Sequence, residues 1–248
     1  HVHEYIKELV RDTNIAEMVT VGEMSSTHLE DCIRYSTANP QERELSMCFS
    51  FHHLKVDYKN GDKWSLMEPD RRMLKKIFED WQLGMEQGNG WNALFWCNHD
   101  QPRIISRLGN EGRFWKESAK MLAAAIHLMR GTPYIYQGEE LGMTNCPFDS
   151  LDEVRDIESL NAFKEMTEAG TIAPEDMLRY INLRGRDNAR TPMQWDGSEN
   201  AGFTKGTPWI KLNPNYKEIN AAAELADSDS VFYYYKKLIA LRKQEAVI

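Results

Sequence analysis

The sequence has few cysteines, and they lie far apart. Its 248 residues contain four of them, Cys32, Cys48, Cys97 and Cys146, and no CxxC pair. Cysteines in such an arrangement are typically small buried apolar side chains, which argues against a disulfide framework or a zinc site. Because free thiols persist in a reducing compartment, we expect a cytoplasmic protein.

Long apolar runs are missing as well. No stretch approaches the roughly 20 residues that a transmembrane helix requires, so we expect no membrane partner. The first residues lead directly into the amphipathic stretch Tyr5–Val10 and show none of the regions of a signal peptide. The sequence also lacks internal repeats and low-complexity tracts.

Positive charge is in short supply. The sequence has 30 Lys and Arg against 38 Asp and Glu, which gives a formal net charge of −8. Because no basic stripe offsets this charge, nucleic acid is excluded as a general partner. A glycine-rich phosphate loop and an HExxH-type histidine spacing are both absent, so we expect neither a nucleotide cofactor nor a catalytic metal.

What the sequence does contain is an alternation of short apolar segments and helical patterns. The strand candidates are Met18–Gly22, Leu45–Phe51, Ala93–Cys97 and Pro133–Tyr136. Helical periodicity is found at 69–81, 116–130 and 230–242, and in the second of these Met121, Leu122 and Ile126 are expected to face inward. Four strands that alternate with helices predict an α/β fold with a parallel sheet.

The segment 145–220 departs from this alternation. It is rich in Asn, Asp, Gly and Pro, and we expect a long excursion after the last strand with one or two helices, for example Pro174–Leu183. In α/β proteins such excursions often build ligand sites at the carboxyl ends of strands, so we expect this one to lie over the active-site face.

Charged side chains follow three of the four predicted strands. Glu23 follows the first strand, His99 and Asp100 follow the third, and Glu139 and Glu140 follow the fourth. Because the carboxyl ends of parallel strands meet at one edge of a sheet, we expect these charges to converge. Any one of them alone is as readily explained as a helix cap or a solvated loop charge, but together they indicate a site. We also expect Glu23 and the His99–Asp100 pair to be partly buried.

Paired carboxylates at such an edge suit the hydrolysis of glycosidic bonds. One carboxylic acid protonates the leaving oxygen, and partial burial keeps it protonated near neutral pH. Another stays ionised and attacks the anomeric carbon or holds the sugar hydroxyls. Phe51, Trp64 and Trp96 are the aromatic residues expected near such a site, and each either stacks on a sugar or belongs to the core.

Four blocks of the sequence resemble a known family. Val21–Met24 and Asn98–Asp100 resemble two short conserved regions of the α-amylase superfamily. Gly131–Asn145 and Gly185–Asp196 resemble the oligo-1,6-glucosidase branch of that superfamily. The resemblance extends along essentially the whole chain, and it implies a retaining α-glycosidase without a cofactor.

Two further blocks narrow the resemblance within this branch. Phe49–Trp64 and Gly22–Thr27 are similar to the trehalose-6-phosphate hydrolases. This similarity implies a role in trehalose catabolism, in which the substrate is a phosphorylated disaccharide and the products are glucose and glucose 6-phosphate. The oligomeric state is not predicted.

The resemblance also implies roles for individual residues. Glu23 resembles the general acid/base. Asp100 resembles the carboxylate that binds hydroxyls of the glucose in the cleavage subsite, and His99 resembles the imidazole that binds the same sugar. Arg186 resembles the arginine that closes this subsite, although its neighbours Arg184 and Arg190 remain alternatives.

The fold implied by the resemblance is a (β/α)8 barrel, of which residues 1–248 would form the C-terminal half, truncated at both ends. In this family the nucleophilic aspartate belongs to a Gly-x-Arg-x-Asp block that should precede His1, and no such block is found. We therefore expect the chain on its own to be inactive, and the open edges of its sheet to need cover.

Recognition of a phosphorylated sugar requires cations outside the cleavage subsite. Lys55 and Lys63 flank a predicted loop after the second strand, which is a suitable place to reach a sugar phosphate. Our hypothesis is that both contact the 6-phosphate, with Lys63 the stronger candidate. The alternative is that they are two solvated surface lysines.

Two other functions remain open. An oligo-1,6-glucosidase, dextran glucosidase or sucrose isomerase would share the block Thr191–Asp196, whereas the segment His52–Tyr58 favours the phosphotrehalase. A non-catalytic scaffold of the same fold, like the ectodomain subunits of some amino-acid transporters, tends to lose its acidic catalytic residues. Retention of Glu23, His99 and Asp100 disfavours this second reading.

Overall fold

The computed structural model describes residues 2–12, 18–39 and 42–245. The chain divides into two compact units. The first contains the residues up to Phe95 together with Met129–Tyr134, and the second contains Trp96–Leu128 and the residues from Ile135 onward. In this described part of the chain, no helix combines the length and the apolar character needed to cross a membrane.

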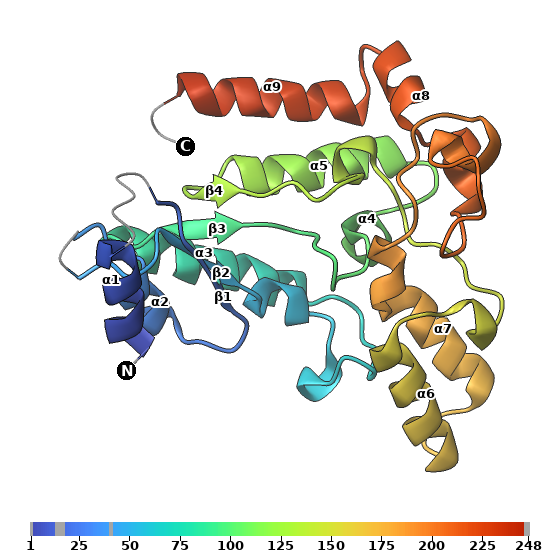
Figure 1. Cartoon of the computed structure of the whole chain (residues 1–248), viewed down its shortest axis with the longest axis horizontal. Helices are drawn as coiled ribbons and strands as arrows, with labels where there is room; N and C mark the ends of the chain where they lie inside the picture. Colours follow the sequence, from blue (N-terminus) through green and yellow to red (C-terminus); the bar gives the residue numbers. More distant parts are fainter. Residues whose placement is uncertain (1, 13–17, 40–41, 246–248) are drawn as a thin grey trace. The chain divides into compact units, whose positions relative to one another are not determined.

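The first unit is built on a sheet of four parallel strands in sequence order (Figure 1). The strands are β1 (Val21–Met24), β2 (Met47–Ser50), β3 (Asn92–Leu94) and β4 (Thr132–Pro133). Neighbouring strands are parallel throughout, which requires a crossover between each pair. All four predicted strands are therefore present, but each is shorter than its apolar run, and β1 begins three residues later than expected.

Three helices and two short 3₁₀ turns complete the first unit. They are α1 (Val2–Asp12), α2 (Leu29–Tyr35), α3 (Arg71–Gln87), η1 (His52–Lys55) and η2 (Lys59–Gly61). The side chain of Asp70 caps α3 by accepting hydrogen bonds from the backbone N–H groups of Arg72 and Met73, which satisfies two donors that the first turn leaves free. The helix therefore begins at Arg71, two residues after the predicted start at Pro69.

The two faces of the sheet differ in what covers them. On one face, Cys48 of β2 packs with Cys32 of α2 and Met85 of α3 in a fully buried cluster. Gly22 lies beside Cys48 in the register, and a Cβ atom at this position would approach Leu45 Cδ1 to 2.5 Å. A side chain at position 22 would therefore require the Leu45 side chain to shift.

The opposite face carries Glu23, which is paired with Phe49 in the register. Successive residues of a strand alternate between faces, so Glu23 and Phe49 lie on the same side of the sheet. The ring of Phe49 contacts the rings of Phe95 and Tyr134, with centroid distances of 5.0 and 4.6 Å. An aromatic cluster therefore occupies the carboxyl ends of the strands on the face that presents Glu23.

The second unit is mainly helical. Its helices are α4 (Ile104–Leu108), α5 (Trp115–His127), α6 (Ile157–Glu168), α7 (Pro174–Arg184), α8 (Ala221–Ala226) and α9 (Val231–Gln244). Short 3₁₀ turns lie between them at η3 (Glu139–Leu141), η4 (Leu151–Glu153), η5 (Arg186–Ala189), η6 (Glu199–Gly202) and η7 (Pro214–Lys217). In Figure 1, α9 runs alongside α5.

Contacts between α5 and α9 fix the core of this unit. The Arg242 guanidinium donates to the carbonyl oxygen of His127 at 2.6 Å, which satisfies an acceptor at the C-terminal end of α5. Leu122 and Ile126 of α5 are buried as predicted. Met121 was expected to face inward, but its side chain is 57% exposed, because the buried stripe of α5 is narrower than its run of apolar residues suggested.

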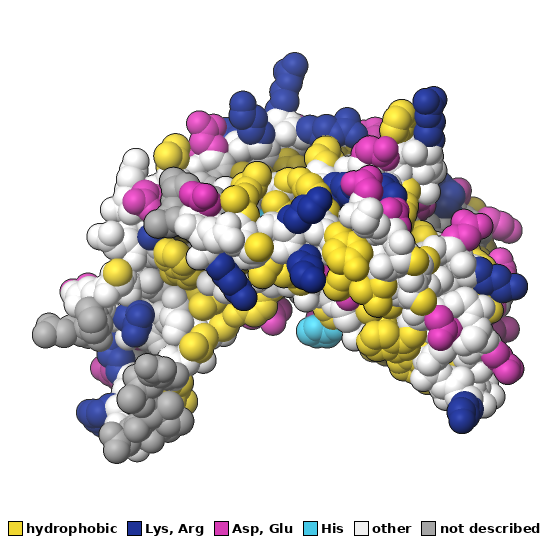
Figure 2. All heavy atoms as spheres, turned by 90° about the horizontal axis from the view of Figure 1, so that it is seen from above, with side chains coloured by type: hydrophobic (Ala, Val, Ile, Leu, Met, Phe, Trp, Pro, Cys, Tyr) yellow, Lys and Arg dark blue, Asp and Glu magenta, His cyan; other side chains and the backbone are white. Residues whose placement is uncertain are grey.

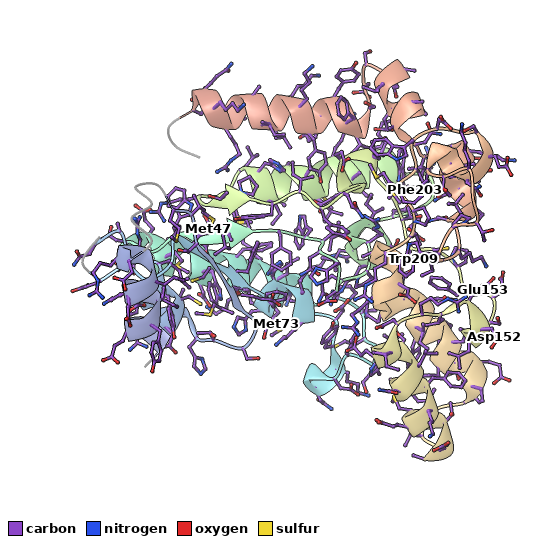
Figure 3. The ribbon with its side chains drawn as sticks, in the orientation of Figure 1. Met47, Met73, Asp152, Glu153, Phe203 and Trp209 are labelled. Carbon is purple, nitrogen blue, oxygen red and sulfur yellow. The ribbon has the colours of Figure 1, made fainter. Side chains whose placement is uncertain are left out.

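The predicted excursion contains two α-helices, α6 and α7. The second matches the prediction to within one residue, because Pro174 occupies the first turn, where its missing N–H costs nothing. Lys211 ties the later part of the excursion to its start, since its ammonium group lies 2.9 Å from Glu153 of η4. The exposed side chains of Phe203 and Trp209 project from this later part (Figure 3).

Charges of both signs are spread over the surface. On the face seen in Figure 2, basic and acidic side chains alternate with hydrophobic ones, and neither sign forms a continuous stripe.

Candidate active site

Glu23 lies at the carboxyl end of β1, one residue before the strand ends. Its side chain is exposed, so the prediction of partial burial is wrong for this residue. The reason is that β1 is an edge strand, which pairs with β2 alone among the described residues. The chain continues into Ser25, whose carbonyl oxygen accepts a hydrogen bond from Lys55 at 3.2 Å.

Asp100 lies in the second unit, six residues after the end of β3. Its backbone N–H donates to the side-chain oxygen of Asn98 at 2.8 Å, which forms a tight turn. One carboxylate oxygen, Oδ1, is 2.7 Å from Arg190 Nη2 and 3.5 Å from Arg186 Nη1. The other, Oδ2, is 3.4 Å from Nε2 of His99. We refer to Arg186 and Arg190 together as the arginine clamp, because both contact the carboxylate of Asp100.

The two arginines are presented by η5 and the residue that follows it. Arg186 begins η5 and Arg190 follows its last residue, and both guanidinium groups approach the same oxygen of Asp100, Oδ1. Arg190 Nε also donates to the carbonyl oxygen of His99 at 2.9 Å. The two arginines therefore bind both the carboxylate of Asp100 and the backbone carbonyl of His99.

The clamp binds Asp100 and leaves its carboxylate within reach of solvent. Two guanidinium charges stabilise the carboxylate, while the Asp100 side chain remains 36% exposed. An ionised carboxylate only accepts hydrogen bonds, so it can bind sugar hydroxyl groups and stabilise positive charge that develops on a neighbouring ring. The neighbouring His99 is more exposed, at 68% for its side chain.

The structure thus brings together His99, Asp100 and Arg186, to which the resemblance gave roles at one sugar, and adds Arg190. Arg190 makes the shorter contact with Asp100, although only its position in the same block as Arg186 had pointed to it. Arg184 instead lies buried at the end of α7. Glu23 belongs to the first unit and Asp100 to the second, so the expectation that they share one active-site mouth remains a prediction.

The two lysines proposed for phosphate occupy different surroundings. Lys55 lines a cleft of about 400 Å³ together with His52, Tyr58 and Trp81. Lys63 lies over the ring of Trp64, with its Nζ atom 5.0 Å from the ring centroid. Both lysines remain partly accessible, and their proposed contact with a phosphate stays a prediction.

The three aromatic residues considered for sugar stacking belong to the core. Phe51, Trp64 and Trp96 are 8, 9 and 1% exposed. The indole N–H of Trp96 donates to the carbonyl oxygen of Leu122 at 2.7 Å, which satisfies its only polar group. Of the two roles left open by the sequence, the structure supports packing.

Glu139 lies in the interior rather than at an open strand end. The hydroxyl of Tyr235 on α9 donates to its Oε1 atom at 2.9 Å, and its Oε2 atom has no hydrogen-bond partner among the described residues. A cavity of about 10 Å³ beside it, which Cys97 and Arg103 also line, has room for about one water molecule. Burial raises the pKa of Glu139 to about 7, against the opposing effect of the Tyr235 hydrogen bond.

Replacement of Glu139 by glutamine is expected to stabilise the protein above pH 7. A carboxyl group whose pKa is higher in the folded than in the unfolded state contributes most to stability at low pH, and this contribution is lost as the pH rises through the folded-state pKa. A shift from 4.5 to about 7 corresponds to about 3 kcal/mol. Urea unfolding of Glu139→Gln should therefore show a weaker decline in stability between pH 5 and pH 8 than the parent protein.

The exposed Glu117 of the same unit provides the control for this measurement. Glu117→Gln should keep the pH dependence of the parent. If Glu139→Gln also kept it, the buried carboxyl would not be the source of the decline.

The described residues offer no metal site, since no three His, Cys, Asp or Glu side chains among them are grouped as ligands. Charges near Asp100 are instead balanced by arginine.

The alpha-amylase catalytic-domain family matches residues 1–248. The chain belongs to the alpha-amylase family. It is 56% identical over 248 residues to the trehalose-6-phosphate hydrolase of Bacillus subtilis, covering 100% of the chain and 44% of that protein. The oligo-1,6-glucosidase of Parageobacillus thermoglucosidasius is 52% identical, again over 100% of the chain and 44% of that relative.

A solved structure extends this similarity to three dimensions. The crystal structure of a trehalose-6-phosphate hydrolase from Bacillus licheniformis matches with a TM-score of 0.93 and 57% identity, covering 98% of the chain and 44% of that structure. The predicted fold class is thereby confirmed, with four parallel strands and helices that belong to a (β/α)8 barrel. The chain spans less than half the length of the relatives it matches.

Proposed function

We propose that the chain forms part of a retaining α-glucosidase that cleaves trehalose 6-phosphate into glucose and glucose 6-phosphate. The observation that carries this proposal is the arginine clamp, which presents an accessible Asp100 carboxylate next to His99. The 56% identity to trehalose-6-phosphate hydrolases supports the choice of substrate. A cytoplasmic location is supported by the proposed substrate, which is a phosphorylated sugar, and by the free cysteines.

In the proposed reaction, the non-reducing glucose binds at Asp100 and His99, and Glu23 protonates the glycosidic oxygen. Glucose 6-phosphate leaves with that proton, while a carboxylate attacks the anomeric carbon. Water, deprotonated by Glu23, then releases glucose and restores the proton to this residue. We place the attacking carboxylate outside these 248 residues, in the part of the relatives' length that the chain does not span.

The segment 145–220 has a defined place in this proposal. It carries both arginines of the clamp, so we propose that it lies over the active-site face and closes the cleavage subsite. Positive charge on the flattened sugar ring would then develop beside Asp100, whose negative charge stabilises it.

A substrate panel tests the proposed function. The product of the complete reading frame that contains these residues should be assayed with trehalose 6-phosphate, trehalose and isomaltose. We expect trehalose 6-phosphate to be hydrolysed with the highest kcat/KM. Preference for isomaltose would instead establish the oligo-1,6-glucosidase alternative, and no turnover of any α-glucoside would favour a non-catalytic scaffold.

If Lys55 and Lys63 bind the phosphate, their replacement should lower kcat/KM for the phosphorylated substrate alone. Loss of a hydrogen bond to a charged group costs about 1.5–3 kcal/mol, so Lys55→Ala and Lys63→Ala should each lower kcat/KM for trehalose 6-phosphate by about 10- to 100-fold. Activity on trehalose, which has no phosphate, should change little. The bond from Lys55 to Ser25, two residues after Glu23, supports its place near the reacting groups.

The control for both lysine variants is Lys59→Ala, because Lys59 is an exposed lysine of the same loop. It should leave both activities unchanged. If the Lys55 and Lys63 variants lost kcat/KM equally on the phosphorylated and the unphosphorylated substrate, neither lysine would have a role in phosphate recognition.

A further inference from the structure

The N-terminus of α6 lies behind the arginine clamp and contains a buried carboxylate, Asp156. Its side chain is completely inaccessible. As the N-cap of α6 it accepts hydrogen bonds from the backbone N–H groups of Glu158 and Ser159, and Oδ2 also accepts from the Ser159 hydroxyl at 2.7 Å. Capping alone would explain an aspartate at this position, but it does not explain its remaining contacts.

Both arginines of the clamp also point at Asp156. Arg186 donates to Oδ1 of Asp156 through Nη2 at 2.6 Å and through Nε at 2.8 Å. Arg190 Nη1 lies 3.7 Å from the same oxygen. The contacts between Arg186 and Asp156 are shorter than the 3.5 Å contact between Arg186 and Asp100. Arg186 therefore makes its shortest contacts with a buried carboxylate, while Glu158 Oε2 lies 3.2 Å from its Nε atom.

A second buried carboxylate connects the same two segments: it belongs to η5 and accepts hydrogen bonds from the backbone at the start of α6. Asp187 lies on η5 directly after Arg186, and its Oδ2 atom accepts hydrogen bonds from the backbone N–H groups of Arg155 and Asp156 at 2.6 and 2.9 Å. Its Oδ1 atom is 3.9 Å from Arg190 Nη1. Each of the two segments therefore contributes a carboxylate that binds the other segment, and these contacts fix the orientation of the two arginines.

We propose that Asp156 is a positioning residue, which holds the guanidinium groups of Arg186 and Arg190 in the orientation that fixes Asp100 for sugar binding. This inference rests on the proposed function. The buried carboxylate acts through the arginines and has no contact with the sugar. The N-terminus of α6 thereby takes part in the active site, through Asp156 and through Glu158, whose Oε2 atom lies 3.2 Å from Arg186 Nε.

The test replaces Asp156 by asparagine in the complete protein. Asparagine caps a helix as well as aspartate does, but it removes the charge that holds Arg186. Because charge-assisted hydrogen bonds are roughly twice as strong as neutral ones, we expect kcat/KM for trehalose 6-phosphate to fall by about 10- to 100-fold. Asp176→Asn is the control, because it removes a carboxylate of the same unit that pairs with an arginine outside the clamp, Arg179; it should retain activity within about twofold.

A double-mutant cycle distinguishes positioning from a general loss of stability. If Asp156 acts through Arg186, Asp156→Asn should cause little further loss in an Arg186→Ala background, whereas independent effects would multiply. Multiplicative losses, or full activity of Asp156→Asn, would overturn the inference.

A crystal structure of the Asp156→Asn variant separates this inference from the proposed function. We expect Arg186 to leave its present position and the carboxylate of Asp100 to move with it. If the parent protein hydrolysed no α-glucoside, the proposed function would fail, but the displacement would still support the positioning role. An unchanged clamp in the variant would overturn the inference whatever the activity of the parent.

Discussion

Replacement of Glu23 by glutamine should lower kcat/KM for trehalose 6-phosphate by about 10²- to 10⁴-fold, the range that a general acid contributes. Glutamine has nearly the same shape, but it cannot donate a proton to the leaving oxygen. The loss in kcat/KM should be much smaller for an aryl α-glucoside, because a phenolate with electron-withdrawing groups leaves without protonation. Initial rates on both substrates measure this difference.

Because glutamine has nearly the same shape as glutamate, Glu23→Gln should have little effect on folding. Glu30→Gln, on the exposed surface of α2, controls for the removal of one negative charge from the same unit. An equal loss on natural and aryl substrates would assign Glu23 another role. Full activity of Glu23→Gln would rule it out as the acid.

Replacement of Asp100 by asparagine should lower kcat/KM by about 10²- to 10³-fold. Hydrogen bonds to the sugar that strengthen in the transition state supply several kcal/mol, and each 1.36 kcal/mol corresponds to a factor of ten in rate. The substitution keeps the size of the side chain but removes the charge that opposes two guanidinium groups. Steady-state kinetics should place most of the loss in kcat, because the interaction is strongest in the transition state.

Asp152 provides the comparison for this variant. It lies exposed on η4 in the same unit (Figure 3) and outside the arginine clamp. Asp152→Asn should have unchanged kinetics. If Asp100→Asn raised KM without lowering kcat, Asp100 would contribute only to substrate binding.

The elements that the sequence predicted best have a local physical cause. Helix α7 starts at Pro174 as expected, because proline fixes the backbone angle of the first helical turn. The four strands were found from their apolar character, but their ends were not, because backbone pairing with neighbouring strands determines where each one ends. Helix α6 was anticipated only as a second helix of unspecified position, although Asp156 is a typical N-cap residue.

For several site residues the prediction from the sequence was wrong or incomplete, because their surroundings depend on tertiary structure. The burial of Glu23 depends on what lies beside β1, and its own strand sequence contains no information about that neighbour. Three arginines in one block could not be told apart, because the orientation of η5 decides that Arg186 and Arg190 reach Asp100 while Arg184 is buried. Glu139 resembled a charge at a strand end, yet α9 covers it through Tyr235 from a distant part of the sequence.

The close packing at Gly22 limits how the specificity of this protein can be altered. In random libraries aimed at the neighbourhood of Glu23, a side chain at position 22 will require Leu45 to move, because its Cδ1 atom occupies that space. Productive diversity should come from the opposite face, where Met47 and Phe49 are the register partners of Val21 and Glu23. Directed evolution of the substrate range should therefore vary β2 and keep Gly22 unchanged.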